Sequence, residues 1–229
     1  MILRLPLLFF IFALVAGCAT PQKSLTRQAQ ESIKSTEHIL IIPQSNLIVD
    51  VLPTNGSGGG LLGVLVAAGI DSVRRSNAEK AASPIIQQLQ NFDFRAVMLK
   101  ALSTEIAKSD KLNTKQPIRL ETIDSESQQR IWFDQSNSDV VIFNNVKYLL
   151  ESGNLIITAN VRMFPKASNL FKLRIKPDPA NPFDAGNAIY FKVFSFTKQG
   201  ITASNATESL SEGAISVAKQ IVADLSHPL

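Results

Sequence analysis

Cysteine and histidine are almost absent from this chain, which limits the chemistry available to it. There is one cysteine, Cys18, and there are two histidines, His38 and His227. With a single cysteine no disulfide can form within the chain, so the fold must rest on packing. Neither histidine has a second ligand at metal spacing, and no serine stands in a GxSxG pattern. The sequence therefore predicts no metal site, no cofactor and no Ser–His–Asp triad.

Charge is also sparse, at 18% of residues, and the formal net charge is only +4. Proteins that bind nucleic acid gather basic residues densely on one face, so we expect no nucleic-acid partner. Carboxylates cluster as Asp124 with Glu126 and as Asp134 with Asp139, and both clusters are typical of solvated loops. Hydrolysis by two carboxylates stays open as a hypothesis, because distant acids can meet in a fold. The sequence otherwise predicts that the protein is not an enzyme.

The longest apolar run lies at the N-terminus. Arg4 precedes the apolar stretch Leu5–Leu14, and the small residues Ala16 and Gly17 follow shortly after it. A charged start, a short apolar core and a small-residue end are the parts of a secretory signal peptide. The run is too short to cross a bilayer as a helix, which takes roughly 20 residues. Residues 1–17 are therefore predicted to be a signal peptide.

The end of this leader, Val15-Ala16-Gly17-Cys18, resembles the lipobox of bacterial lipoproteins. In that family the chain is cut before the cysteine, which then carries lipid such as palmitate on its sulfur and its amino group. The resemblance implies that Cys18 is lipidated and holds the protein to a membrane. The alternative is an ordinary signal peptide in which Cys18 is incidental. Several acyl chains anchor durably, because each buried CH₂ contributes about 0.8 kcal/mol.

Ala19 follows the cysteine. In lipoproteins of Gram-negative bacteria, aspartate at that position commonly retains the protein in the inner membrane. The resemblance therefore implies an outer-membrane protein whose body faces the periplasm. Residues 18–36 are polar, and we expect them to form a lipidated flexible tether, the alternative being a short helix over Leu25–Ile33. Residues 37–229 are expected to form a single periplasmic domain.

A glycine-rich segment interrupts the chain after residue 53. Residues 58–63 spell GxGxxG, but no repeating βαβ pattern surrounds them and no P-loop lysine follows. Two interpretations of 58–70 stay open. The favoured one is a connector that leads into a buried helix. The other is a segment for self-association or membrane contact, because Gly59, Gly63 and Ala67 recur at a spacing of four.

Apolar periodicity predicts the remaining elements. Helices are expected over about 78–91, 94–109 and 205–226, with a shorter one inside 124–138. Strands are expected at 38–43, 46–52, 117–123, 139–150, 155–164, 170–176 and 187–197. The first two strands form either a hairpin or one long strand kinked near Pro43. We expect an α+β fold: a mostly antiparallel sheet of five or six strands, with the helices of 61–109 and 205–226 packed on one face.

The segment 170–176 alternates between apolar and basic residues. The expected inward set is Phe171, Leu173 and Ile175, and the outward set is Lys172, Arg174 and Lys176. The basic residues either discourage edge-to-edge strand pairing or form a surface for an anionic partner. Such a partner is a lipid headgroup, a cell-wall polymer or an acidic protein. Further basic residues are expected on neighbouring strands, namely Arg162, Lys166 and Lys192.

The order of elements is similar to that of periplasmic modules in envelope lipoproteins that act as assembly factors or synthase activators. This similarity carries little weight for function. The anchor, the tether, the lack of a catalytic constellation and the small-residue apolar helix favour a non-enzymatic adaptor or subunit of a cell-envelope assembly, with an envelope protein as partner. The alternative is a periplasmic carrier or sensor of a small apolar ligand held between sheet and helices. A carboxylate-based hydrolase is the third hypothesis.

Overall fold

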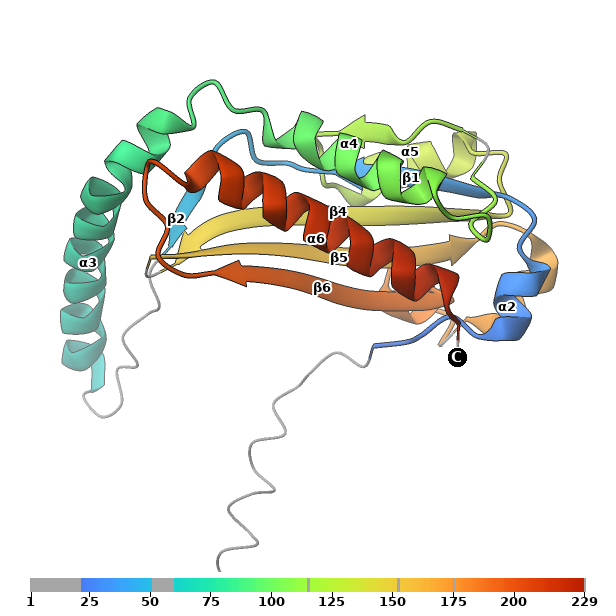
Figure 1. The fold of residues 1–229 in the computed structure, drawn as a ribbon. Helices are drawn as coiled ribbons and strands as arrows, with labels where there is room; N and C mark the ends of the chain where they lie inside the picture. Colours follow the sequence, from blue (N-terminus) through green and yellow to red (C-terminus); the bar gives the residue numbers. More distant parts are fainter. Residues whose placement is uncertain (1–21, 51–59, 115, 152, 175, 229) are drawn as a thin grey trace, which may run out of the picture.

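A six-stranded sheet with helices on both faces organises the computed structural model, which describes residues 22–50, 60–114, 116–151, 153–174 and 176–228 (Figure 1). The strands are β1 (Thr36–Ile41), β2 (Ile48–Asp50), β3 (Arg119–Glu121), β4 (Val140–Glu151), β5 (Asn154–Pro165) and β6 (Tyr190–Lys198). The helices are α2 (Arg27–Ser32), α3 (Gly60–Gln88), α4 (Phe94–Ala107), α5 (Glu126–Gln135) and α6 (Ala206–Ser226), with 3₁₀ turns η2 (Ser168–Leu173) and η3 (Ala185–Asn187). The predicted α+β class is confirmed.

The sheet is mixed, so the prediction of a mostly antiparallel sheet holds only in part. Its strand order is β3-β1-β4-β5-β6, and β2 lies beside the far end of β4. The β4–β5–β6 portion is antiparallel, and its first turn contains Gly153 at φ 80°, where glycine carries no steric cost. The β1–β3, β1–β4 and β2–β4 pairs are parallel, because helical crossovers bring the chain back in the same direction.

The first two strands do not form the predicted hairpin. β1 and β2 both run parallel to β4, at Val140–Asn145 and at Leu149–Glu151 respectively. They therefore behave as one long strand that is interrupted between residues 42 and 47. The alternative of a kinked strand describes this part of the chain better.

One face of the sheet carries the main core, under α4 and α6. The predicted apolar stripe of α6 is buried throughout, from Leu210 to Leu225. The predicted helix after Asp93 is confirmed, and the Asp93 side chain accepts a hydrogen bond from the Ala96 amide at 3.1 Å. An acceptor at this position satisfies an amide that has no partner inside the helix. Both helices therefore form where their sequence patterns predict them.

The opposite face carries a second core, which corrects the prediction that the helices pack on one face. Leu40 and Ile42 of the first strand region face α4 and α6, while Ile39 and Ile41 face the other way, and all four are fully buried. Successive strand residues point to opposite faces, so both faces of β1 need a cover. Trp132 of α5 provides part of the cover on the second face.

The described part of the predicted tether, residues 22–36, belongs to the folded body. Lys23 pairs with Phe191 of β6 through two backbone hydrogen bonds of 2.7 and 3.0 Å. Leu25 is only 2% exposed, and Ala29 of α2 is equally buried. Thr26 caps α2 by accepting from the Ala29 amide at 3.2 Å. The short-helix alternative is therefore the better description, because two apolar side chains one turn apart find a place in the core.

The glycine-rich segment leads into one long helix, so the helix start predicted near residue 78 is wrong. α3 runs from Gly60 to Gln88 and contains Pro84. Ala82 and Ile85 pack against the sheet and α6, whereas Figure 1 shows most of α3 standing beyond the end of the sheet. Residues 58 and 59, and the side chains of 60–72, lie outside the described residues, so self-association through 58–70 stays a prediction. Within the described ranges, no helix has the length and hydropathy needed to span a bilayer.

Candidate functional site

The predicted basic strand over 170–176 is wrong. Residues Ser168–Leu173 form the 3₁₀ turn η2, in which the Leu170 amide donates to the Ala167 carbonyl at 3.0 Å. β5 already pairs with β4 on one side and β6 on the other, so it offers no edge for a further strand. Phe171, predicted to point inward, is 40% exposed, and Ile175 lies outside the described residues.

The three predicted basic residues of this segment do not share a strand face. Lys172 and Lys176 are exposed, while Arg174 is half-buried with its guanidinium 4.1 Å from the centre of the Phe171 ring. No acidic partner pairs with any of the three within the described ranges. They lie at one end of the sheet, where η2 contacts α2.

The other basic residues of that prediction have internal partners. Arg162 donates to the Phe183 carbonyl at 2.8 Å, and Lys166 donates to the Phe133 carbonyl at 2.7 Å. Lys192 forms an ion pair with Asp224 of α6 at 2.5 Å. These side chains tie loops and helices to the sheet, so they do not extend a basic surface.

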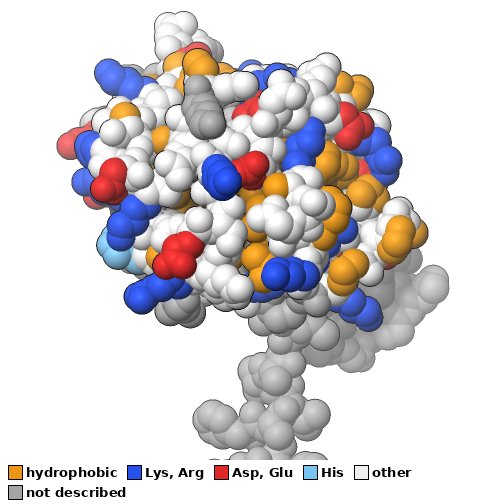
Figure 2. Space-filling model, turned by 90° about the vertical axis from the view of Figure 1, so that its right-hand side faces the viewer, with side chains coloured by type: hydrophobic (Ala, Val, Ile, Leu, Met, Phe, Trp, Pro, Cys, Tyr) orange, Lys and Arg blue, Asp and Glu red, His pale blue; other side chains and the backbone are white. Residues whose placement is uncertain are grey.

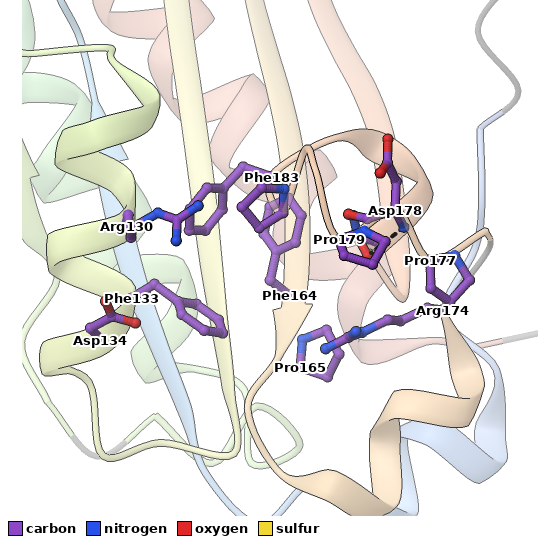
Figure 3. A pocket seen from close by; sticks show the side chains of 12 residues that line it. Arg130, Phe133, Asp134, Phe164, Pro165, Arg174, Pro177, Asp178, Pro179 and Phe183 are labelled. Carbon is purple, nitrogen blue, oxygen red and sulfur yellow. Dashed lines mark hydrogen bonds between the residues drawn. The ribbon is translucent and has the colours of Figure 1, made fainter.

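A cleft of about 260 Å³ opens between α5 and the proline-rich loop of residues 174–187 (Figure 3). Its apolar lining comes from three phenylalanines and several prolines. The phenylalanines are Phe133 of α5, Phe164 of β5 and Phe183 of the loop. This cleft is the best-formed candidate binding site in the part of the chain that the structure describes.

The floor of the cleft is an aromatic cluster that exists before anything binds. The Phe183 ring lies 5.6 Å from Phe133 and 5.4 Å from Phe164, at interplanar angles of 79° and 77°. Phe143 of β4 adds a third edge-to-face contact at 5.8 Å. Such pairs contribute about 0.5–1.5 kcal/mol each beyond their buried area, which holds Phe183 in place.

The loop that carries Phe183 is itself fixed by a buried amide. The Asn187 side chain donates to the carbonyls of Asp178 and Asn181, at 2.7 and 2.9 Å, and accepts from the Asp178 amide. Satisfying three backbone groups at once keeps an irregular loop in one conformation. The cleft wall is therefore preorganised.

The rim of the cleft carries both signs of charge. Arg130 lies 4.0 Å from Glu126, whereas Arg174 has no ion pair among the described residues. Two hydrogen bonds to the Asp178 carboxylate lower its pKa. The larger effect comes from the Asn181 side chain and the smaller one from the Ala180 amide. The lining holds no histidine, cysteine or serine, and its phenylalanine and proline side chains suit the binding of an apolar group.

The carboxylates of the hydrolase hypothesis are mostly engaged in structure. Asp124 accepts from the side chains of Gln129 and Asn145, both at 2.9 Å. Asp139 accepts from the Lys34 amide at 2.7 Å, and Asp134 lines the cleft. In the described ranges, no three side chains of metal-binding type come together.

Neither histidine lines the cleft. His38 on β1 is fully buried, its Nε2 atom has no hydrogen-bond partner among the described residues, and burial lowers its pKa to about 4. His227 follows α6, where its Nδ1 lies 2.8 Å from the Ala223 carbonyl. His38 is therefore a neutral core residue at neutral pH.

Comparison with known proteins gives no family for this chain. No protein-family model matches it, and no curated protein matches it in sequence. One solved structure of an uncharacterised protein has a TM-score of 0.38 and 7% identity, covering 90% of this chain and 97% of that one. The PelC dodecamer from Paraburkholderia phytofirmans has a TM-score of 0.35 and 11% identity, with coverages of 90% and 95%. A DUF330 protein from Xanthomonas campestris has a TM-score of 0.33 and 8% sequence identity, and the match covers 88% of this chain and 90% of that one. Such weak likeness does not bear on function.

Proposed function

We propose that this chain is a lipid-anchored outer-membrane protein that works as a non-enzymatic adaptor or subunit of an envelope assembly. The observation that carries the proposal is the only cysteine, Cys18, placed directly after Val15-Ala16-Gly17 and a short apolar run. The folded body supports it, since Lys23 already pairs with β6 and so holds the body close to the anchor.

The aromatic cleft is the proposed place for a protein partner. Pockets that hold drug-sized ligands measure about 300–1,000 Å³. The cleft, at about 260 Å³, is nearer to the size of one large side chain. Partner proteins commonly fill such desolvated pockets with a single aromatic or arginine anchor. Here the phenylalanine floor favours an apolar anchor.

The lipidation part of the proposal is tested in the native host. The Cys18→Ser chain is expected to take up no radioactive palmitate and to leave the outer membrane. The Ala19→Asp chain is the matched control, since it is expected to keep the label but move to the inner membrane. Palmitate labelling of Cys18→Ser would contradict lipidation at this cysteine.

The cleft is tested by a photo-crosslinking amino acid placed at the exposed rim residue Arg130. We expect one envelope protein to be crosslinked there and not from Ile215, an exposed position on α6. Equal crosslinking from both positions would contradict a specific partner at the cleft.

The second candidate function is carriage of a small apolar ligand, which the same preformed aromatic floor favours. Native mass spectrometry of the purified protein distinguishes the two. A bound small molecule that is lost in the Phe183→Ala variant would favour the carrier over the adaptor.

A further inference from the structure

Lys23 fixes the position of the proposed anchor relative to the fold. Its backbone makes two hydrogen bonds with Phe191, and its Nζ donates to the Leu173 carbonyl at 2.5 Å. Five residue steps separate Cys18 from Lys23, and an extended chain covers at most about 3.6 Å per residue. Cys18 therefore lies within about 18 Å of Lys23. A lipid on Cys18 would bring the end of the domain that holds Lys23 to the membrane.

That end of the domain is formed by α2, η2 and the segment that follows η2. α2 contacts η2, and the Gln30 side chain joins α2 to the last turn of α6 by donating to the Leu225 carbonyl at 3.0 Å. Figure 1 shows α2 at the end of the sheet opposite to α3, and Figure 2 looks directly onto it. We call this surface the anchor end.

The anchor end is basic. Its basic residues are Lys23, Arg27, Lys34, Lys172, Arg174 and Lys176. The acidic residues of the same segments are fewer: Glu31 is exposed on α2, and Asp178 lies two residues from Lys176 and interacts with its charge. Asp139 nearby already accepts from the Lys34 amide. Figure 2 shows blue basic side chains over this surface, with some red acidic ones among them and hydrophobic ones gathered toward one side. Basic residues near an anionic bilayer each strengthen binding roughly five-fold.

An exposed aromatic ring lies within this basic surface. Phe171 is 40% exposed, whereas its neighbour Leu170 is completely buried in the main core. The Arg174 guanidinium stacks on the Phe171 ring at 4.1 Å, so the pair presents an apolar plate beside a positive charge. Segments that bind at a membrane surface commonly place phenylalanine at the boundary of headgroups and acyl chains, with lysine and arginine on their polar side.

We propose that the anchor end lies flat on the anionic headgroups of the membrane that holds the lipid. This inference rests on the lipidation of Cys18 proposed above. Phe171 enters the headgroup layer, and the lysines beside it contact lipid phosphates. α3, at the opposite end of the sheet, is held away from that membrane and faces the periplasm.

The orientation is tested on the lipidated chain in vesicles of phosphatidylethanolamine and phosphatidylglycerol. Cys18 is the only native cysteine, so lipidation leaves an introduced cysteine as the sole thiol for a bimane label. The label is placed at the exposed Lys172 by Lys172→Cys, and at the exposed Val73 of α3 by Val73→Cys. Brominated phospholipids are expected to quench bimane at position 172 strongly and at position 73 hardly at all. Equal quenching, or stronger quenching at position 73, would overturn the proposal.

Charge reversal separates headgroup binding from simple proximity. Lys34→Glu with Lys176→Glu is expected to reduce the quenching at position 172. The matched control, Lys80→Glu with Lys147→Glu, changes two exposed lysines away from the anchor end and is expected to leave it unchanged. Equal effects of the two pairs would contradict a lipid-binding anchor end. If Cys18 is not lipidated, the unsubstituted chain itself reacts with bimane and stays off the vesicles, which identifies failure of the anchor and not of the orientation.

Discussion

A single buried histidine predicts that the stability of this fold depends on pH. His38 of β1 is fully buried, and its Nδ1 atom lies 3.5 Å from the Asn144 side-chain nitrogen. A charged imidazolium is poorly solvated there, so burial lowers the pKa of His38 to about 4. The unfolded chain, in contrast, takes up a proton near pH 6.5. Acidification therefore favours the unfolded state.

We expect the free energy of unfolding to fall by about 2 kcal/mol between pH 7 and pH 5 through His38 alone. Between its unfolded and folded pKa values, the unfolded state binds one more proton, so stability is retained above pH 6.5 and lost as the pH falls toward 4. In His38→Leu this part of the pH dependence is expected to disappear. Urea unfolding at both pH values, followed by fluorescence of the only tryptophan, Trp132, measures it. His227→Gln is the control, and a flatter profile in that variant would contradict the assignment to His38.

Individual elements divide into those fixed by local sequence and those fixed by distant contacts. The helix after Asp93, the α6 stripe and the β4–β5 turn could all be predicted, because periodicity, caps and turn residues are local signals. The failure of residues 170–176 to form a strand could not be predicted, because it depends on β5 already pairing with β4 and β6.

The candidate cleft was beyond prediction for the same reason. Phe133, Phe164 and Phe183 come from a helix, a strand and a loop, and nothing in their spacing indicates that their rings meet. The available signals were the aromatic residues within 131–133 and the proline-rich loop before Phe183. The first indicated the apolar face of a short helix, the second indicated an irregular loop, and neither indicated a shared site.

The segment of α2 supplies a direct test of where the folded domain begins. Leu25 is buried among residues of the main core. Leu25→Ala is therefore expected to lower the free energy of unfolding by about 2–4 kcal/mol. Gln28→Ala, at an exposed position of the same helix, should change it by less than about 0.5 kcal/mol. Urea unfolding of the two purified variants decides the point, and equal stabilities would show that residues 22–36 form a tether after all.

The whole molecule is an elongated domain with two unlike ends. β4 and β5 each contain twelve residues and set its length at about 40 Å. Lys23 and the basic surface lie at one end, and α3 stands at the other (Figure 1). An anchor on Cys18 would therefore orient the molecule, leaving α3 and the long faces of the domain free for envelope partners.

Lipid on Cys18 is the claim on which this orientation depends, and the mature N-terminus tests it most directly. Trypsin cleavage after Lys23 should release the peptide of residues 18–23 from the purified membrane protein. Mass spectrometry is expected to find this peptide beginning at Cys18, with a diacylglyceryl group on sulfur and an acyl chain on the amino group. A mature chain that begins at another residue, or an unmodified Cys18 thiol, would contradict the account.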